Sequence, residues 1–204
     1  MKNSSSLLLP LALCALFWCP AYAEKADRQK PMNVEADALR YDDLKQTSLF
    51  TGNVVITKGT IIIRGARIDV RQDPEGYQHG LATAAPGQLA FYRQKREGAD
   101  EFIEGEAESI EYDGKADVVK FIRKAVLRRY KGASMNDETT GNQINYDNNT
   151  DIFTVDGGAA NASPGNPTGR IRALLTPKDA AAAAPAPAPS AALRSTRSID
   201  GDKR

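Results

Sequence analysis

Three glutamates at alternate positions are the strongest candidates for acid–base chemistry in this chain of 204 residues. Two carboxylates held close together can act as general acid and base in hydrolysis, so Glu104, Glu106 and Glu108 suggest that chemistry. Side chains two positions apart on a β-strand point to the same face of a sheet. The spacing therefore favours a solvated acidic row over a catalytic pair, and we predict no catalytic residue. A hydrolase that uses Glu104 and Glu106 remains an alternative hypothesis.

Soft ligands for a metal are few, since the sequence has two cysteines, one histidine and three methionines. Residues 147–151, Asp-Asn-Asn-Thr-Asp, begin like a calcium loop. An EF-hand needs Gly at its sixth position and Glu at its twelfth, where this sequence has Ile152 and Gly158. A turn is therefore expected here. His79, the only histidine, has no second ligand near it in the sequence and is expected in an exposed loop. We predict no metal site and no cofactor.

The most basic stretch of the chain has the side chains to bind phosphate groups. Its cations are Arg123, Lys124, Arg128, Arg129 and Lys131. Surface charges usually lie in mixed clusters, so ion pairs between this stretch and the acidic row are favoured over a phosphate site. The formal net charge of only +1 also argues against a dedicated nucleic-acid-binding protein.

The segment that must position these side chains, residues 24–158, alternates apolar and polar residues almost throughout. This alternation is the signature of β-strands, and proline, which breaks the hydrogen-bond ladder, is nearly absent from the apolar runs. Helical periodicity is almost absent. We therefore predict an all-β fold.

A short unit recurs within this segment. Residues 36–41, 107–112 and 141–146 each have a small residue, an aliphatic residue three positions later and Tyr five positions later, and residues 65–70 are a weaker copy. Stacked copies would bury these positions on one sheet face, either as a filled core or as the lining of a trough. The positions are Leu39, Tyr41, Ile68, Val70, Ile110, Tyr112, Ile144 and Tyr146. The opposite positions, expected to face water, are Arg40, Asp69, Glu111 and Asn145.

The N-terminus has the features of a signal for export. Residues 1–23 combine an early lysine, an apolar run and the small-x-small site Ala21-Tyr22-Ala23, which together predict a cleaved signal peptide. Cleavage after Ala23 would remove both cysteines, so disulfides and cysteine chemistry are not expected in the mature chain. An uncleaved N-terminal anchor is the alternative.

The C-terminal segment, residues 159–204, differs in composition from the rest. It is rich in alanine and proline and carries a basic excess. Such a composition cannot build a packed core, so we predict a disordered basic tail.

Three segments carry a resemblance to a known family. They are Phe-Thr-Gly-Asn-Val-Val-Ile-Thr-Lys-Gly-Thr-Ile at 50–61, Ala-Phe-Tyr at 90–92, and the acidic stretch at 104–112. With the repeat and the export signal, they resemble the OstA-like family of periplasmic lipopolysaccharide-transport proteins of Gram-negative bacteria. The likeness covers most of residues 31–158. It departs from the family at 121–125, where Phe-Ile-Arg-Lys-Ala replaces a Thr-Gly-Asn turn.

The resemblance implies that residues 24–158 form an OstA-like domain, a curved, slightly open antiparallel β-jellyroll. It implies a non-enzymatic periplasmic protein that binds lipopolysaccharide, carries its acyl chains in an apolar trough and serves outer-membrane assembly. Copies would assemble head to tail through the strands at 31–39 and 142–156. The implied partners are lipopolysaccharide, further copies of the chain, an LptC-like inner-membrane component and an LptD-like outer-membrane component, and no nucleic acid.

The resemblance also implies which apolar residues line the trough. The foremost candidates are Met32, Val34, Phe91 and Tyr112. Further candidates are Phe50, Val54, Ile56, Ile61, Ile63, Phe121, Ile144 and Phe153. Two alternatives remain open: a structural interaction module of the same fold with a dry interior, and an LptC-like relative that keeps its N-terminal anchor.

Overall fold

The structure is a computed structural model, and it describes residues 27, 30–96, 100–158, 162 and 166–177. The predicted signal peptide, residues 1–23, lies outside the described residues. Residues 178–204 of the predicted tail also lie outside them. Within the described residues, no helix is long and apolar enough to cross a membrane.

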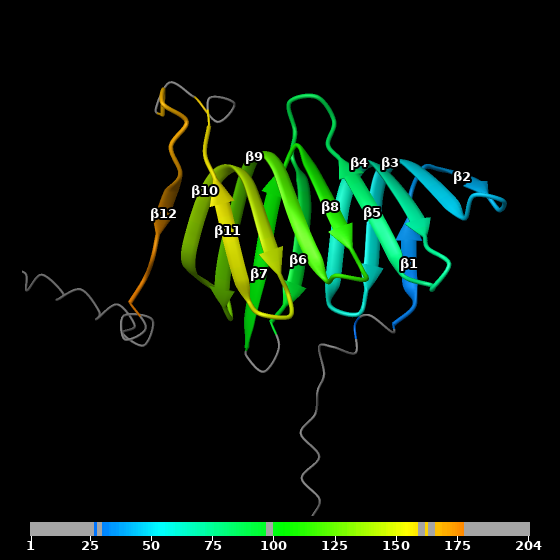
Figure 1. Ribbon diagram of the computed structural model, residues 1–204, viewed down its shortest axis with the longest axis horizontal. Coiled ribbons are helices and arrows are strands. Elements are labelled where there is room, and N and C mark those ends of the chain that lie inside the picture. The colour runs from blue at the N-terminus through cyan, green and yellow to red at the C-terminus, as the bar shows by residue number, and fades with distance from the viewer. Residues whose placement is uncertain (1–26, 28–29, 97–99, 159–161, 163–165, 178–204) are drawn as a thin grey trace, which may run out of the picture.

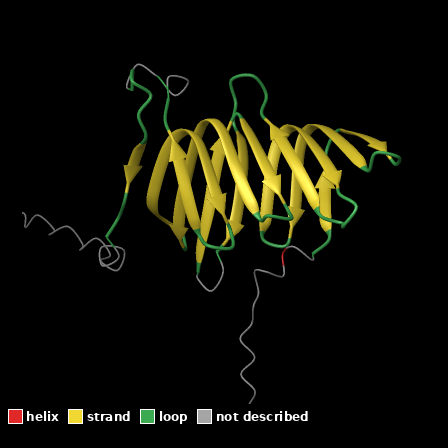
Figure 2. Cartoon of the chain, in the orientation of Figure 1, coloured by secondary structure: helices red, strands yellow, loops and turns green. Residues whose placement is uncertain are grey.

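The described chain is a sequence of antiparallel strands, which confirms the predicted all-β fold (Figures 1 and 2). All the strands are hydrogen-bonded into one sheet that folds over on itself. Their bounds are β1 (Met32–Glu35), β2 (Ala38–Asp42), β3 (Thr47–Lys58), β4 (Ile61–Gln72), β5 (Gln78–Thr83), β6 (Ala90–Lys95), β7 (Glu101–Ala107), β8 (Ser109–Asp113), β9 (Val118–Lys131), β10 (Ser134–Asp147), β11 (Ile152–Asp156) and β12 (Arg172–Leu174).

Four long strands, β3, β4, β9 and β10, divide the sheet into two layers because each contributes one half to each layer. Layer A contains β2, β5, β8 and β11, which pair with one half of these long strands. Layer B contains β1, β6, β7 and β12, which pair with the other half. Consecutive long strands are hydrogen-bonded to each other along most of their length, β3 to β4 and β9 to β10. The layers are therefore joined along one edge, where the long strands pass from layer A to layer B.

Left-handed backbone conformations help β3 and β9 to bend between the layers. In β3 the bend is at Gly52 and Asn53, with φ of 78° and 47°, where the register shifts between Thr51 and Val54. In β9 the bend is at Arg123 and Lys124, with φ of 63° and 50°. Glycine and asparagine enter this region readily, whereas other residues do so at a cost of about 1–2 kcal/mol. The segment at 121–125 therefore forms the same kind of bend with less favourable residues.

Ion pairs accompany the bend in β9. Glu108, between β7 and β8, accepts a hydrogen bond from Arg123 Nε at 2.8 Å and pairs with Lys124 Nζ at 2.9 Å. The hydrogen bonds from Lys124 and Arg123 lower the pKa of the Glu108 carboxyl. The backbone N–H of Glu108 also donates to the carbonyl of Arg123. These contacts hold Arg123 and Lys124 against Glu108, where the chain passes from β7 in layer B to β8 in layer A.

The strand register aligns the repeated sequence units into continuous rows across layer A. On the inner face, one row runs Leu39, Phe50, Ile68, Ala82, Ile110, Phe121, Ile144 and Val155, and the next runs Tyr41, Ser48, Val70, Gly80, Tyr112, Val119, Tyr146 and Phe153. On the outer face, the row is Arg40, Leu49, Asp69, Leu81, Glu111, Lys120, Asn145 and Thr154. The inner and outer faces predicted from the repeat are both confirmed.

Layer B supplies the facing half of the interior. Its central inner row is Val34, Ile56, Ile63, Tyr92, Gly105, Leu127, Thr139 and Ala173. Tyr92 packs edge-on against Phe121 of layer A, with 5.9 Å between ring centroids. A methyl group at Gly105 would overlap the Phe121 ring, so the absence of a side chain there lets the layers approach. The two inner faces together form one buried apolar core.

The fold continues past residue 158, the boundary expected from the sequence. Strand β12 pairs antiparallel with β10 over three residues, Glu138 with Leu174, Thr139 with Ala173 and Thr140 with Arg172. It covers the edge of layer B, as β11 covers the edge of layer A. All three β12 residues are exposed, so this pairing adds little buried surface.

Candidate functional site

The apolar interior between the layers is the feature most extended along the fold. Its centre is closed to solvent: Ile68, Ile110, Phe121 and Ile144 are at most 1% exposed. Its N-terminal end is open, because β1 and β2 are the last strands of their layers and nothing in the described chain covers them. There, Leu39 is 59% exposed and Tyr41 is 55% exposed, although both belong to the inner rows. The interior therefore meets solvent at this end.

All but one of the predicted lining residues face this interior. Met32, Val34 and Phe153 are partly buried against the core. The buried members are Phe50, Val54, Ile56, Ile61, Ile63, Tyr112, Phe121 and Ile144. Their contact with lipid remains a prediction. That prediction requires their side chains to point into the interior, as they do.

Phe91 is the exception, and the expectation that it lines the interior is wrong. In β6 the buried positions are Ala90, Tyr92 and Gln94, so Phe91 points to the outer face of layer B. The guanidinium of Arg64 lies 5.1 Å from the centroid of its ring. Because Phe91 and Tyr92 are adjacent aromatic residues, the sequence alone does not decide which of them faces the interior. The strand register places Tyr92 on the inner face opposite Gly105, where its ring packs edge-on against Phe121.

A small cavity of about 30 Å³ lies between the layers near the open end. A cavity of this size has room for only a few water molecules, far less than an acyl chain needs. Its lining includes five of the predicted residues, and Lys58, Gln78 and His79 also contribute. The predicted residues are Met32, Ile56, Ile61, Ile63 and Tyr112. The interior can accept an acyl chain only if the layers move apart.

Polar contacts join the two layers along the side opposite the bends. This side, which we call the slit, lies between the hairpin turns of layer A and those of layer B. Lys58 Nζ of layer B donates to Gln78 Oε1 of layer A at 2.9 Å. Arg96, beside the β6–β7 turn, donates from Nε to Asp151 Oδ1 in the β10–β11 turn at 3.2 Å. Such contacts can exchange for water, so the slit is the side on which the layers can separate with the least loss of apolar contact.

Tyr146 reinforces the slit from inside. Its hydroxyl donates to Asp151 Oδ1 at 2.7 Å, the same oxygen that accepts from Arg96. Burial, and then the hydrogen bond to Asp151, raise the pKa of Tyr146 well above its ordinary value. The phenol therefore stays protonated and acts as a donor at every physiological pH.

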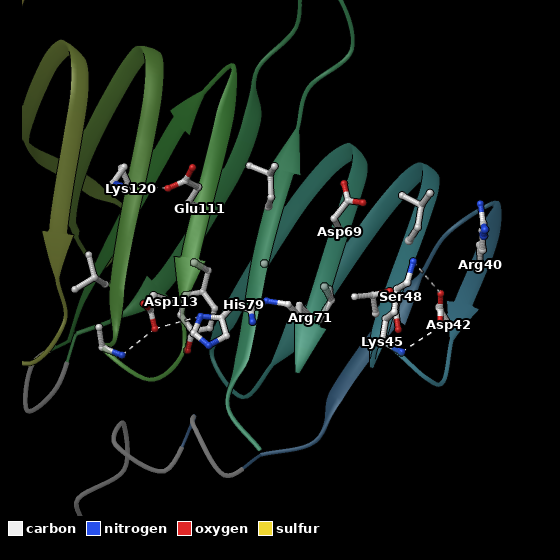
Figure 3. Close-up of a pocket in the computed structure, with 18 residues that line it drawn as sticks. Arg40, Asp42, Lys45, Ser48, Asp69, Arg71, His79, Glu111, Asp113 and Lys120 are labelled. Carbon is white, nitrogen blue, oxygen red and sulfur yellow. Dashed lines mark hydrogen bonds and ion pairs between the residues drawn. The ribbon is translucent and has the colours of Figure 1, made fainter. Parts of the chain in front are cut away.

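A groove of about 780 Å³ crosses the outer face of layer A (Figure 3). Two ion pairs lie along it, Lys120 with Glu111 at 3.3 Å and Lys45 with Asp42 at 3.9 Å. Its apolar lining residues include Leu49, Leu81 and Val118. Charged and apolar side chains are therefore mixed along this groove.

His79 was expected in an exposed loop, but it lies in β5 and its side chain is only 22% exposed. Its Nε2 is 3.3 Å from Asp73 Oδ2, and its Nδ1 is 3.4 Å from Asp113 Oδ1. Hydrogen bonds from the backbone N–H groups of Ala116 and Lys115 lower the pKa of Asp113, and the nearby His79 contributes further. The imidazole thus links two turns of layer A at the slit.

The acidic row forms ion pairs on the outer face, as the sequence favoured. Glu104 pairs with Arg93 at 2.5 Å, and Glu106 pairs with Arg128 at 2.7 Å. Arg128 also donates to Glu138 at 2.7 Å. Each carboxylate is therefore paired with a guanidinium and not with the other carboxylate, an arrangement unlike the facing carboxyl groups of a hydrolase.

The segment resembling a calcium loop is a turn, as expected. Asp147 Oδ1 accepts hydrogen bonds from the backbone N–H groups of Asn149 at 2.8 Å and Thr150 at 3.3 Å. The bond from Asn149 is the main cause of the lowered pKa of Asp147. The side chain stabilises its own turn, which connects β10 to β11.

Comparisons with known proteins agree on one group of relatives. A family model described as "LptA/(LptD N-terminal domain) LPS transport protein" matches residues 33–152. The lipopolysaccharide export system protein LptA of Escherichia coli K12 is 31% identical over 140 residues, covering 68% of this chain and 74% of that protein. Its counterpart LptH of Pseudomonas aeruginosa is 27% identical over 158 residues, covering 78% and 86%.

A solved structure has the same fold. It is the crystal structure of LptH, the LptA homologous periplasmic component of the conserved lipopolysaccharide transport device from Pseudomonas aeruginosa. It is 25% identical to this chain with a TM-score of 0.61, and the likeness covers 74% of this chain and 99% of that one.

Proposed function

Since the chain belongs to the LptA/LptD N-terminal family of lipopolysaccharide transport proteins, we propose that it carries lipopolysaccharide through the periplasm by holding its acyl chains between layers A and B. The observation that carries this proposal is the apolar inner row of layer A from Leu39 to Val155, which runs without interruption from β2 to β11. We propose no enzymatic activity for it, because the family is a transport family and the candidate carboxylates are tied in ion pairs.

The energetics favour a conduit that recognises acyl chains. Burying lipid chain contributes about 0.8 kcal/mol per CH₂ group, so a twelve-carbon chain contributes roughly 10 kcal/mol. A surface ion pair contributes at most about 1 kcal/mol. The apolar contribution has no preferred direction, so a lipid can move along an apolar row without breaking specific bonds.

Loading requires the layers to separate along the slit. The bends at Gly52–Asn53 and Arg123–Lys124 would act as the hinge, and the contacts of Lys58 and Arg96 across the slit would open. In the closed form, side chains fill the interior. The incoming acyl chains would then replace apolar contacts between the layers with contacts of the same kind, which keeps the cost of opening low.

We further propose that copies assemble head to tail. The N-terminal end leaves β1 and β2 as edge strands, and the C-terminal end leaves β11 and β12. Edge strands pair readily with another chain through main-chain hydrogen bonds. If β2 of one copy pairs with β11 of the next, the inner rows continue across the junction, with Leu39 beside Val155 and Tyr41 beside Phe153. The end partners would be LptC-like and LptD-like components.

Native mass spectrometry of protein extracted from the periplasm tests the lipid proposal. We expect the wild-type protein to carry the added mass of lipopolysaccharide or its lipid A portion. Val34→Asp places a charge on a half-buried inner position near the open end and should remove most of that mass. Asn33→Asp introduces the same charged residue on the opposite face of β1, and this variant should retain the added mass.

One observation favours a second candidate function. The cavity in the closed structure is only about 30 Å³, as expected for a structural interaction module with a dry interior. In that case the wild-type protein would emerge free of lipid, and Val34→Asp and Asn33→Asp would give the same spectrum. An LptC-like role would need an N-terminal anchor, a segment outside the described residues.

A further inference from the structure

The hairpin turns of layer A are joined to one another along the slit. We call these joined turns the rim, which consists of the β2–β3, β4–β5, β8–β9 and β10–β11 turns. Between the first two turns, the backbone N–H of Gln72 donates to the carbonyl of Gln46 at 3.0 Å. Between the second and the third, the backbone N–H of Gly114 donates to the carbonyl of Gln78 at 2.9 Å. Backbone hydrogen bonds thus connect the turns beyond the ends of their strands.

Side chains strengthen the connection between the β4–β5 and β8–β9 turns. The imidazole of His79 lies between two carboxylates, 3.3 Å from Asp73 Oδ2 and 3.4 Å from Asp113 Oδ1. Figure 3 shows His79 beside Asp113. Lys115 Nζ lies 2.6 Å from Glu75 Oε2. Both contacts reach from one turn to the other, so the two turns hold each other in place.

The β10–β11 turn is fixed to the β8–β9 turn in a similar way. Asn148 donates to Asp117 twice, from its backbone N–H to the carbonyl at 3.0 Å and from Nδ2 to Oδ1 at 3.1 Å. Asn149 Nδ2 donates to the carbonyl of Ala116 at 2.9 Å. Asp117 is only 8% exposed, so water competes little for its hydrogen bonds. The rim can therefore move as one body without losing these internal contacts.

Arg96 of layer B holds the rim through an ion pair. Its Nε donates to Asp151 Oδ1 in the β10–β11 turn at 3.2 Å, and its Nη1 pairs with Glu101 of β7 in its own layer. The Arg96 side chain is 19% exposed, so solvent screens this pair less than a pair on the open surface. The hydroxyl of Tyr146 donates to the same Asp151 oxygen. Separating the layers breaks the contact between Arg96 and Asp151, whereas the bond between Tyr146 and Asp151 stays within layer A.

We propose that the Arg96–Asp151 ion pair is a latch that controls the opening of the slit along its whole length. The proposal rests on the proposed function, since it takes lipid to enter through the slit. When the latch opens, the joined turns of the rim move together about the bends in β3 and β9. The interior then becomes accessible at positions far from Arg96. The latch stabilises only the empty, closed form, so it slows lipid entry and lowers lipid affinity by the same factor.

The substitutions that open the latch must leave the turn intact. Asp151→Asn removes the charge and keeps an acceptor for the Tyr146 hydroxyl. Asparagine also tolerates a left-handed backbone, and Asp151 has φ of 56°. Arg96→Gln removes the charge on the other side of the slit. Because the two residues act through one contact, the double variant should have the same effect as either single variant.

Thiol labelling of the lipid-free protein tests the latch itself. The full chain is used with Cys14 and Cys19 changed to serine, so that each introduced cysteine is the only one. Ile103→Cys reports the interior in β7 near the latch, and Val70→Cys reports the cavity near the open end. Each latch variant should speed labelling at both positions about fivefold. This is the change that corresponds to about 1 kcal/mol, the contribution of one ion pair.

Two controls separate opening of the latch from loss of stability. Ala107→Cys, at a buried position at the end of β7 beside the bends, reports global unfolding, and its labelling should not change. Lys120→Gln breaks the ion pair with Glu111 inside layer A and should leave labelling at every position unchanged. Faster labelling at position 103 alone would show that the rim bends locally. That result, equal acceleration at position 107, or unchanged rates at 70 and 103 would each overturn the latch.

Titration of lipid A in detergent links the latch to loading. Asp151→Asn should bind lipid A about fivefold more tightly than the wild type, with faster entry and unchanged release. Damage to the fold would weaken binding instead. Unchanged affinity in a variant whose thiols are labelled faster overturns the role of the latch in loading. If the wild type binds no lipid A, the proposed function is contradicted and that role with it, while faster labelling would still establish the latch as a property of the fold.

Discussion

Leu39→Asp is expected to leave the monomer folded and to abolish most head-to-tail self-association. Leu39 belongs to an inner row of layer A, yet it is 59% exposed because β2 is the last strand of its layer. An exposed position tolerates an aspartate with a change in the free energy of unfolding of about 0.5 kcal/mol or less. In the proposed assembly the same position would be covered by the next copy.

The expected size of the effect follows from what the junction buries. Covering a leucine side chain contributes about 1.5–3 kcal/mol, and burying an unpaired carboxylate adds a further cost. At 1.4 kcal/mol per tenfold change, the dissociation constant for self-association should rise by about tenfold to a hundredfold. Sedimentation velocity over a range of protein concentrations measures this change directly.

Leu44→Asp is the matched control for this prediction. Leu44 is 97% exposed in the β2–β3 turn, outside the inner rows. The substitution is the same, but self-association should not change. Should both variants associate like the wild type, the junction does not run through β2, and the proposed continuity of the inner rows between copies would be wrong.

Phe121→Ala is expected to lower the free energy of unfolding by about 3–5 kcal/mol. Phe121 has no exposed surface, stacks edge-on with Tyr92 across the layers and fills the space left by Gly105. Removing the ring leaves a cavity at the centre of the core, where both layers are held in place by their neighbours. Chemical denaturation followed by circular dichroism gives the free energies of the variant and the wild type.

Phe91→Ala is the control that separates the two faces. The lost ring is the same, but Phe91 lies on the outer face of layer B against Arg64. An exposed cation–π contact contributes about 0.5–1 kcal/mol, so a loss of that order is expected. Similar losses in Phe91→Ala and Phe121→Ala would contradict the assignment of the two rings to opposite faces.

Much of the interior could be predicted because the repeat fixes both the spacing and the facing of its residues. Ile68, Ile110 and Ile144 occupy equivalent positions in three units, and the register brings them into a single row. The alternation of period two then assigns Asp69, Glu111 and Asn145 to the outer face. This inference needs only the pleat of a strand and no long-range information.

The residues that the sequence misplaced depend on contacts between distant segments. Phe91 and Tyr92 are adjacent aromatic residues in one strand, and the pairing of β6 with β4 and β7 decides which of them is buried. His79 appeared to be isolated because Asp113, one of its partners, belongs to another hairpin. Strand β12 is a short exposed addition whose composition does not distinguish it from a tail.

Lys58 was overlooked for a different reason. It lies within the run that carries the family resemblance, where it reads as the polar end of a strand before a turn. Its direction into the interior follows from the burial of Val54 and Ile56 in the same strand. The signal in the sequence was the alternation of positions 54, 56 and 58, which places Lys58 on the same face of the strand as Val54 and Ile56.

Photo-crosslinking in living Gram-negative cells tests most directly whether the inner face touches lipid. A photoreactive residue at Tyr112, in the inner row, is compared with one at Glu111, its neighbour on the outer face. We expect a lipopolysaccharide adduct at position 112 and none at position 111. An adduct of equal yield at both positions, or at neither, would contradict the claim that the lipid travels between the layers.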